Sequence, residues 1–184
     1  MVLRLLEGKN VNLRVVEKED LPLLQEWWND PDFAGIYNPL IPQESKTDIE
    51  KDYEKLGSEK AWFLIVKKDG TRIGYFGMGL VGPHWEIGYI LIPSERGKDY
   101  CSEAVTIGID YLFLSKEIVR IQAHTDTENK ASQKVLEKNG FKREGIVRKA
   151  MFMWGQWKDE YLYSILREEW KEPKILTRIT WKNE

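Results

Sequence analysis

Two periods of apolar residues alternate along the chain, and turn residues separate them. Apolar residues at every second position are typical of a half-buried strand, whereas apolar residues three and four apart are typical of a helix. Residues 29–42 contain three prolines and no steady period, which indicates a loop or a short irregular helix. The pattern predicts strands at residues 11–15, 61–67, 72–81, 85–92, 119–125, 142–154 and 157–166. It predicts helices at residues 19–28, 49–56, 102–112 and 129–139.

The order of these elements predicts the fold class. An Asp69-Gly70 turn joins two strands as a hairpin, and the glycines of the second strand indicate a bulge or a close approach of another backbone. The later part of the chain alternates strand and helix before a closing hairpin. We expect a mixed α/β fold, of the α+β kind, in which a mostly antiparallel central sheet of about seven strands is flanked by about four helices.

No repeat or linker divides the 184 residues, so a single domain is expected. Residues 170–184 form a C-terminal tail that could pack on the domain or on a second subunit. Its apolar residues include Ile175, Leu176, Ile179 and Trp181.

The stretch from Trp85 to Ala104 combines three features of an anion site. An apolar strand ends at Pro93, a loop with two basic residues around Gly97 follows, and Ser102 opens a helix. The free N–H groups and the dipole at a helix start favour a phosphate group. From these residues alone, the alternative is a solvated loop that binds nothing.

Composition narrows the classes of function. The chain has 28 basic and 30 acidic residues and a formal charge of −2, which disfavours general nucleic-acid binding. Its apolar runs are too short for a membrane span, and its first residues turn charged too quickly for a signal peptide. We therefore expect a soluble, cytoplasmic protein with no membrane partner and no direct nucleic-acid partner. With one cysteine and two histidines, neither an internal disulfide nor a metal site is expected.

The eight tryptophans are scattered along the chain, and we expect most of them to be packing residues. Trp154 and Trp157 flank the turn of the last hairpin, where exposed aromatic side chains could shape a substrate groove. The tryptophans stand at positions 27, 28, 62, 85, 154, 157, 170 and 181.

Four ordered blocks of the sequence resemble the GNAT superfamily of acetyl-CoA-dependent N-acetyltransferases, and within it the branch that acetylates the N-terminal alanine or serine of ribosomal proteins. The blocks are VNLRVVEKEDLPLLQEWWND, EIGYILIPSERGKDYCSEA, TENKASQKVLEKNGFKREGIVRKA and GQWKDEYLYSILREEW. The resemblance covers nearly the whole chain. It implies the GNAT fold, acetyl-CoA as cofactor and an amine as acceptor.

The resemblance also implies how coenzyme A is bound. The loop after the apolar strand would hold the pyrophosphate through backbone amides, and the strand would splay from its neighbour so that the pantetheine arm pairs with it. The implied cofactor-binding residues are Tyr89, Ile90, Leu91, Ile92, Arg96, Gly97, Lys98, Asp99, Tyr100, Cys101, Ser102, Asn129 and Ser132.

Two residues of this loop depart from the family pattern. Asp99 stands where glycine is usual, and Cys101 stands where glycine or alanine is usual. Aspartate tolerates a positive φ better than most residues, although a carboxylate repels a pyrophosphate unless it points away. We expect Cys101 to be a small buried residue, and a reactive thiol at the helix start is the alternative.

Ser132 and Glu86 are the predicted catalytic residues. Asn129 and Ser132 are three apart at a helix start, and from spacing alone they need be only a cap and a first-turn residue. The resemblance implies that Asn129 contacts the pantetheine arm. It makes Ser132 the candidate that protonates or hydrogen-bonds the leaving thiolate, with water as the alternative, because Leu136 replaces the tyrosine that many relatives use. His84 and Glu86 are the candidate bases, and the resemblance favours Glu86.

The pKa of the amine helps to choose the acceptor. About one in ten α-amino groups is neutral at pH 7, against about one in 2,500 lysine-type amines, so a protein or peptide N-terminus is expected. Met151 stands where ribosomal-protein enzymes have an acidic residue, which leaves the identity of the acceptor protein open. Whether the chain forms a homodimer is also left open.

Two alternatives to this function follow from the residues. A polyamine is the alternative acceptor, because acidic residues gather near one predicted helix, although a solvated helix face also explains them. A non-catalytic acyl-CoA-binding or interaction module is the alternative of a different class. The acidic residues are Glu44, Asp48, Glu50, Asp52 and Glu54, and Lys46, Lys51 and Lys55 stand among them.

Overall fold

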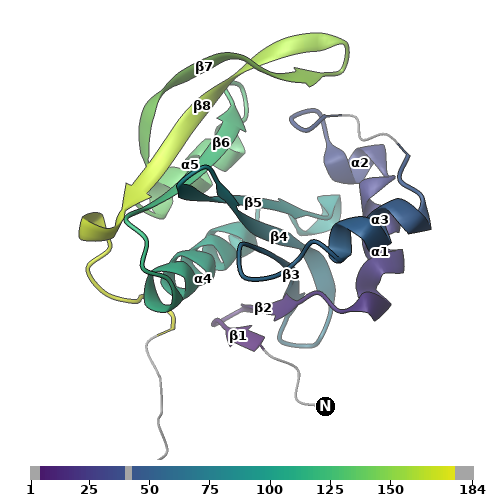
Figure 1. Cartoon of the computed structure of the whole chain (residues 1–184), viewed down its shortest axis with the longest axis horizontal. Helices are drawn as coiled ribbons and strands as arrows, with labels where there is room; N and C mark the ends of the chain where they lie inside the picture. Colours follow the sequence, from purple (N-terminus) through teal and green to yellow (C-terminus); the bar gives the residue numbers. More distant parts are fainter. Residues whose placement is uncertain (1–4, 40–42, 177–184) are drawn as a thin grey trace, which may run out of the picture.

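The computed structural model describes residues 5–39 and 43–176, which form one eight-stranded sheet. The strands lie in the order β1-β2-β3-β4-β5-β6-β8-β7 (Figure 1). All neighbouring strands are antiparallel except β5 and β6. The bounds are Leu5–Glu7 for β1, Val11–Val15 for β2, Lys60–Lys67 for β3, Arg72–Val81 for β4, His84–Leu91 for β5, Arg120–Asp126 for β6, Lys142–Met153 for β7 and Gln156–Leu166 for β8.

The described residues contain five α-helices, which pack against the two faces of the sheet. None of these helices is both long enough and apolar enough to cross a membrane. The bounds are Leu21–Trp28 for α1, Pro31–Ala34 for α2, Lys46–Tyr53 for α3, Tyr100–Ser115 for α4 and Lys130–Lys138 for α5. Short 3₁₀ turns lie at Lys18–Asp20, Pro93–Glu95 and Arg167–Glu169.

Alternate residues of β3 face two separate cores. Trp62 and Leu64 pack with α1, α2 and α3, whereas Phe63 and Ile65 pack on the side of α4 and α5. A strand that is buried on both faces reads as a continuous apolar run, which explains the pattern of residues 61–66. Figure 1 shows α1, α2 and α3 gathered together and α4 on the other side of the sheet.

The predicted fold class is confirmed, and three details differ. The sheet has eight strands rather than about seven, because β1 is a three-residue edge strand that is too short to show a period. Within residues 29–42, α2 is a single turn capped by Asp30, whose side chain accepts the N–H of Asp32 at 2.9 Å. The helix expected to reach Leu56 is α3, which ends at Tyr53.

The parallel strands β5 and β6 pair only at their beginnings. Trp85 pairs with Ile121, and Glu86 pairs with Gln122. Beyond these residues, β5 follows β4 while β6 follows β8, so the two strands separate. We call this place, between residues 87–91 of β5 and 123–126 of β6, the fork. It is the splay that the family resemblance implies.

Gly74 in β4 marks a close approach between two backbones. A Cβ atom at this position would lie 2.3 Å from the carbonyl oxygen of Ile90 on β5. The predicted close approach is therefore confirmed, and the glycine allows β5 to lie flat against β4. The pairing of β3 with β4 also shifts register between Ile65 and Val66, as expected for a bulge.

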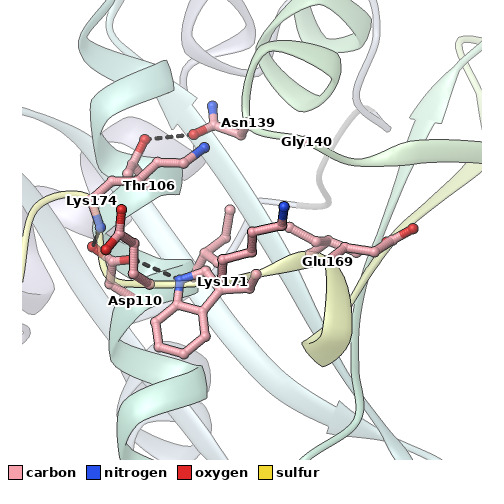
Figure 2. A pocket seen from close by; sticks show the side chains of 11 residues that line it. Thr106, Asp110, Asn139, Gly140, Glu169, Lys171 and Lys174 are labelled. Carbon is pink, nitrogen blue, oxygen red and sulfur yellow. Dashed lines mark hydrogen bonds between the residues drawn. The ribbon is translucent and has the colours of Figure 1, made fainter.

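The chain after β8 packs on α4 through one buried carboxylate. Asp110 is fully buried, and its Oδ1 accepts a hydrogen bond from Trp170 Nε1 at 2.9 Å. Its Oδ2 accepts the three N–H groups of residues 174–176 at 2.7–3.1 Å. A cavity of about 270 Å³ lies beside Asp110 and is lined also by Trp170, Lys171 and Glu172. Figure 2 shows Asp110 among the side chains that line it. Ile179 and Trp181 lie outside the described residues.

Most of the described tryptophans are packing residues, as expected. Those packed against the two cores are Trp27, Trp28, Trp62, Trp85 and Trp170. Trp154 and Trp157 are 46% and 60% exposed at the tip of the β7–β8 hairpin. Trp154 Nε1 donates to the carbonyl oxygen of Asn38 at 3.1 Å, so the hairpin tip contacts the segment after α2.

Candidate functional site

The loop between β5 and α4 turns through two left-handed residues. Gly97 has a φ of 75° and Asp99 a φ of 68°. Helix α4 begins directly after Asp99. The left-handed region favours glycine and is tolerated by aspartate, so the backbone requirement expected at this family glycine is confirmed.

Six consecutive backbone N–H groups in this loop have no acceptor among the described residues. They belong to residues 97–102, and the next N–H, that of Glu103, bonds to the carbonyl oxygen of Asp99 at 3.2 Å. Free donors at the start of a 16-residue helix, together with its dipole, form a binding site for an anion. The loop therefore fits a diphosphate, whose oxygen atoms accept several such bonds.

The charged side chains of the loop bond to the protein itself. The Arg96 guanidinium donates to three carbonyl oxygens, two in α2 and one at the end of β5, at 2.7–3.1 Å. Lys98 bonds to Glu95 at 3.0 Å. Main-chain donors rather than these two cations make the anion site, and cofactor contacts by Arg96 and Lys98 stay predictions.

The Asp99 carboxylate is turned toward Lys138 at the end of α5, and the two side chains form an ion pair. Both side chains are largely exposed, at 70% for Asp99 and 58% for Lys138, so the pair by itself adds little stability. The pair sets a positive charge beside the carboxylate that stands in the anion loop.

We expect the substitution Lys138→Ala to weaken the binding of coenzyme A about fivefold, because a bare carboxylate near a diphosphate costs about 1 kcal/mol in water. Asp99→Gly in the same chain should restore the affinity. Isothermal titration of coenzyme A into the single and double variants measures both effects. Wild-type affinity in Lys138→Ala would show that the ion pair has no role in binding.

Strand β5 turns a row of main-chain donors toward the fork. The N–H of Ile92 donates to the carbonyl oxygen of Ile73 at 2.9 Å, and the β4–β5 register is regular. Since an antiparallel ladder directs alternate residues to its partner, the N–H groups of Ile87, Tyr89 and Leu91 point to the opposite edge. An extended ligand with amide groups could pair with this edge as a strand would.

On the face of the sheet covered by α4 and α5, Tyr89 of β5 contacts Ser132 of α5. Their hydroxyl oxygens are 3.1 Å apart. Burial raises the pKa of Tyr89, so this hydroxyl stays protonated and can donate. Asn129 caps α5, with its Oδ1 accepting the N–H of Ser132 at 3.1 Å, and Leu136 is fully buried. The structure thus places Ser132 at the fork, and contacts of Asn129 with pantetheine stay a prediction.

On the opposite face of the sheet, Glu86 lies in a polar cluster. Its Oε2 accepts from Gln122 Nε2 at 2.9 Å and lies 3.1 Å from His124 Nδ1. The bond with His124 lowers the pKa of Glu86 although burial opposes this, so Glu86 is a weaker base than a free carboxylate. His84, the other candidate base, has a buried Nδ1 without a partner in the described part of the chain.

Two groups at the fork were not predicted from the sequence: the imidazole of His124 and the side-chain hydroxyl of Tyr89. Alternation in residues 119–125 places His124 on the polar face of its strand, and this is the only local signal. Glu86 and His124 are 38 positions apart, and they meet because a parallel pairing across α4 joins their strands.

Cys101 is half-buried near the fork. Burial raises the pKa of its thiol to about 12, so the thiol is protonated at neutral pH. This favours the expectation of a small packing residue over the expectation of a reactive thiol.

The described residues hold no group of three or more His, Cys, Asp or Glu side chains that could bind a metal ion. What they do hold is an anion loop of main-chain donors that leads into a fork with a free strand edge. A diphosphate followed by an extended amide chain fits this arrangement, and coenzyme A has both. The fold and the site together therefore define an acyltransferase of the acyl-CoA-dependent class.

The family follows from comparison with known proteins. A profile described as acetyltransferase (GNAT) domain matches residues 10–142, so the chain belongs to the GNAT acetyltransferase family. The protein is an acetyl-CoA-dependent acyltransferase.

Three relatives show how far the similarity extends. An N-acetyltransferase of Bacillus licheniformis is 32% identical over 170 residues, which are 88% of this chain and 96% of the relative. The ribosomal-protein-S5-alanine acetyltransferase of Vibrio fischeri superimposes with a TM-score of 0.77 at 25% identity, covering 91% of this chain and 99% of that one. The spermidine N-acetyltransferase of Vibrio cholerae, solved with CoA and spermine, has a TM-score of 0.78 at 22% identity and covers 88% and 98%.

Proposed function

We propose that this enzyme transfers the acetyl group to the α-amino group of a protein or peptide. The observation that carries this proposal is the similarity to a ribosomal-protein-S5-alanine acetyltransferase, which covers 91% of this chain at 25% identity. About one-tenth of α-amino groups are already neutral at pH 7, so such an acceptor needs less help from a base than a lysine-type amine does.

The proposed roles of the residues divide between the two faces of the sheet. Bound acetyl-CoA supplies an acyl carbon that is activated as a thioester. The free N–H groups of β5, including that of Tyr89, are placed to stabilise charge on the acyl oxygen. Ser132 on the α5 side donates to the departing sulfur, and the hydrogen-bonded pair of Glu86 and His124 on the other face serves the removal of the amine proton.

The β7–β8 hairpin supports a peptide as acceptor. Its tip bonds to the segment after α2 through Trp154 and Asn38, and Figure 1 shows the hairpin reaching beyond the body of the molecule. Exposed Trp157 and Phe152 stack edge to face at this tip, with ring centroids 5.6 Å apart. Aromatic side chains beside a peptide backbone bind it with little loss of conformational entropy. We place the activity in the cytoplasm, where new N-termini are exposed.

A polyamine is the second candidate, supported by the acidic residues near α3 and by the structural similarity to a spermidine acetyltransferase. Local partners weaken it. Asp52 pairs with Lys55 at 2.6 Å, and Asp48 bonds to Ser45 as part of the cap of α3. Glu44 has a buried Oε2 with no partner in the described part, and burial raises its pKa. Part of the acidic residues near α3 are thus occupied by local hydrogen bonds and ion pairs.

An acceptor panel tests the proposal. Acetylation of peptides with N-terminal Ala or Ser should proceed with a kcat/KM at least tenfold above that of spermidine and of free lysine. The same peptides with a blocked N-terminus and one internal lysine are the matched controls and should not react. A preference for spermidine would show that the enzyme is a polyamine acetyltransferase. Coenzyme A binding without turnover on any acceptor would leave a non-catalytic acyl-CoA-binding module.

A further inference from the structure

His124 lies on the face of the sheet opposite α4 and α5. In β6 the buried residues Ile121 and Ala123 alternate with half-buried Gln122 and His124. Ile121 and Ala123 pack in the core with α4, so His124 points to the opposite face. It stands two residues beyond Gln122, where the pairing with β5 ends. Its imidazole therefore lies beside the fork.

The contact with Glu86 selects the tautomer of His124. An ionised carboxylate only accepts hydrogen bonds, so His124 Nδ1, 3.1 Å from Glu86 Oε2, carries the proton. Gln122 Nε2 donates to the same oxygen at 2.9 Å and keeps the carboxylate in place. In neutral His124 the free lone pair is then on Nε2. No hydrogen bond reaches this atom from residues 5–39 or 43–176.

The charges around His124 come from three strands. Glu86 on β5 raises the pKa of His124 through its hydrogen bond, and Glu160 on β8 adds to this, while burial and Arg120 on β6 oppose it. Arg120 is itself bound to Glu144 at 2.6 and 2.8 Å. Glu160 is half-buried opposite Asp126, and burial raises its pKa. His124 is 28% exposed, so a small amine can reach it.

We propose that His124 is the general base of this enzyme and that Glu86 is the residue that positions it. The inference deepens the proposed function, because it assigns the proton-accepting atom on the acceptor side of the same site. A carboxylate that holds the distal nitrogen of an imidazole fixes the ring and stabilises its protonated form. Glu86 then contacts His124 rather than the amine.

The transfer balances with these groups. A neutral amine forms the new C–N bond to the acyl carbon, and its excess proton moves to His124 Nε2. The C–S bond breaks, and its electron pair leaves on sulfur, which accepts a hydrogen bond from Ser132. The products are the amide, a thiolate and one imidazolium. Water takes the proton from His124 before the next turnover.

The test uses His124→Asn, whose amide group can still donate to Glu86 but cannot accept a proton. We expect kcat/KM for an Ala- or Ser-peptide to fall at least about 100-fold at pH 7, since general base catalysis contributes about 10²–10⁴-fold. In the wild type, a plot of log kcat/KM against pH should have a slope of two at pH values below the pKa values of the amine and of His124. The slope should be one in His124→Asn. Glu144→Gln, a matched carboxylate change on the same face, should keep the slope of two.

A second measurement does not depend on turnover. The chain has two histidines, so a proton NMR titration of the wild type and of His84→Gln assigns the signal of His124. Glu86→Gln should lower the pKa of His124, because it removes the negative charge that stabilises the imidazolium. An unchanged pKa in Glu86→Gln, or a slope of two in His124→Asn, would overturn the proposal. If the wild type acetylates no peptide, the proposed acceptor fails, and the titration still decides the pairing of Glu86 with His124.

Discussion

Replacing Ser132 by alanine is expected to lower kcat about 100-fold while the dissociation constant of coenzyme A stays within about twofold. The reason is the position of the Ser132 hydroxyl, which lies on the α5 side of the fork, 3.1 Å from the Tyr89 hydroxyl. A positioned donor at the leaving group contributes about 10²–10⁴-fold. Leu136, at the position of the tyrosine used by many relatives, is fully buried and offers no replacement donor. Steady-state kinetics with the preferred peptide and titration calorimetry with coenzyme A measure the two quantities.

Tyr89→Phe is the matched control for this prediction. The Tyr89 hydroxyl, kept neutral by its raised pKa, can donate to Ser132 Oγ and so strengthen that serine as a donor. Loss of the Tyr89 hydroxyl should lower kcat about tenfold, which is less than the effect of losing the Ser132 hydroxyl. If Tyr89→Phe costs more than Ser132→Ala, the tyrosine rather than the serine acts on the leaving group. An unchanged kcat in Ser132→Ala would remove the serine from the reaction.

Replacing Asp110 by alanine is expected to lower the free energy of unfolding by about 3 kcal/mol, because four hydrogen bonds to a buried carboxylate are lost. Leaving four donors buried without partners would cost more than this. The segment at residues 170–176 should therefore detach from α4, so that its amides bond to water. Thermal unfolding should show a midpoint about 6–12 °C lower. Hydrogen exchange should show faster exchange at residues 174–176.

Glu172→Gln is the control for Asp110→Ala. This side chain lines the same cavity but is exposed, and its substitution should change stability by no more than about 0.5 kcal/mol. Slow exchange at residues 174–176 in Asp110→Ala would show that apolar packing alone holds the segment.

The sequence by itself predicted most of the elements that build this fold. The strand at residues 72–81 and the turn at Asp69-Gly70 were placed correctly, because burial on one face imposes a period on neighbouring residues. The positive φ at Asp99 fits the family glycine that it replaces, because aspartate tolerates this conformation. Local patterns missed β1, which spans three residues, and placed the end of α3 at Leu56 instead of Tyr53.

The loop at Arg96 shows what local pattern could not decide. In the sequence, Arg96 and Lys98 beside Gly97 indicate side chains that could bind an anion. In the structure, the Arg96 guanidinium donates instead to carbonyl oxygens of α2, which is more than 60 positions away. The donors left free are main-chain N–H groups. No local pattern indicates which side chains are already hydrogen-bonded within the protein, because the partners of Arg96 come from another part of the chain.

The sequence alone therefore determined the class of the protein. The order of strand, loop and helix start and the four family blocks together indicate an enzyme that uses acetyl-CoA. Only the tertiary structure decided which polar side chains meet at the fork. It separates β5 from β6 after Glu86, places Ser132 on one face of the fork and brings His124 to Glu86 on the other. Such contacts depend on where a parallel pairing ends, and that point leaves no periodic mark in either strand.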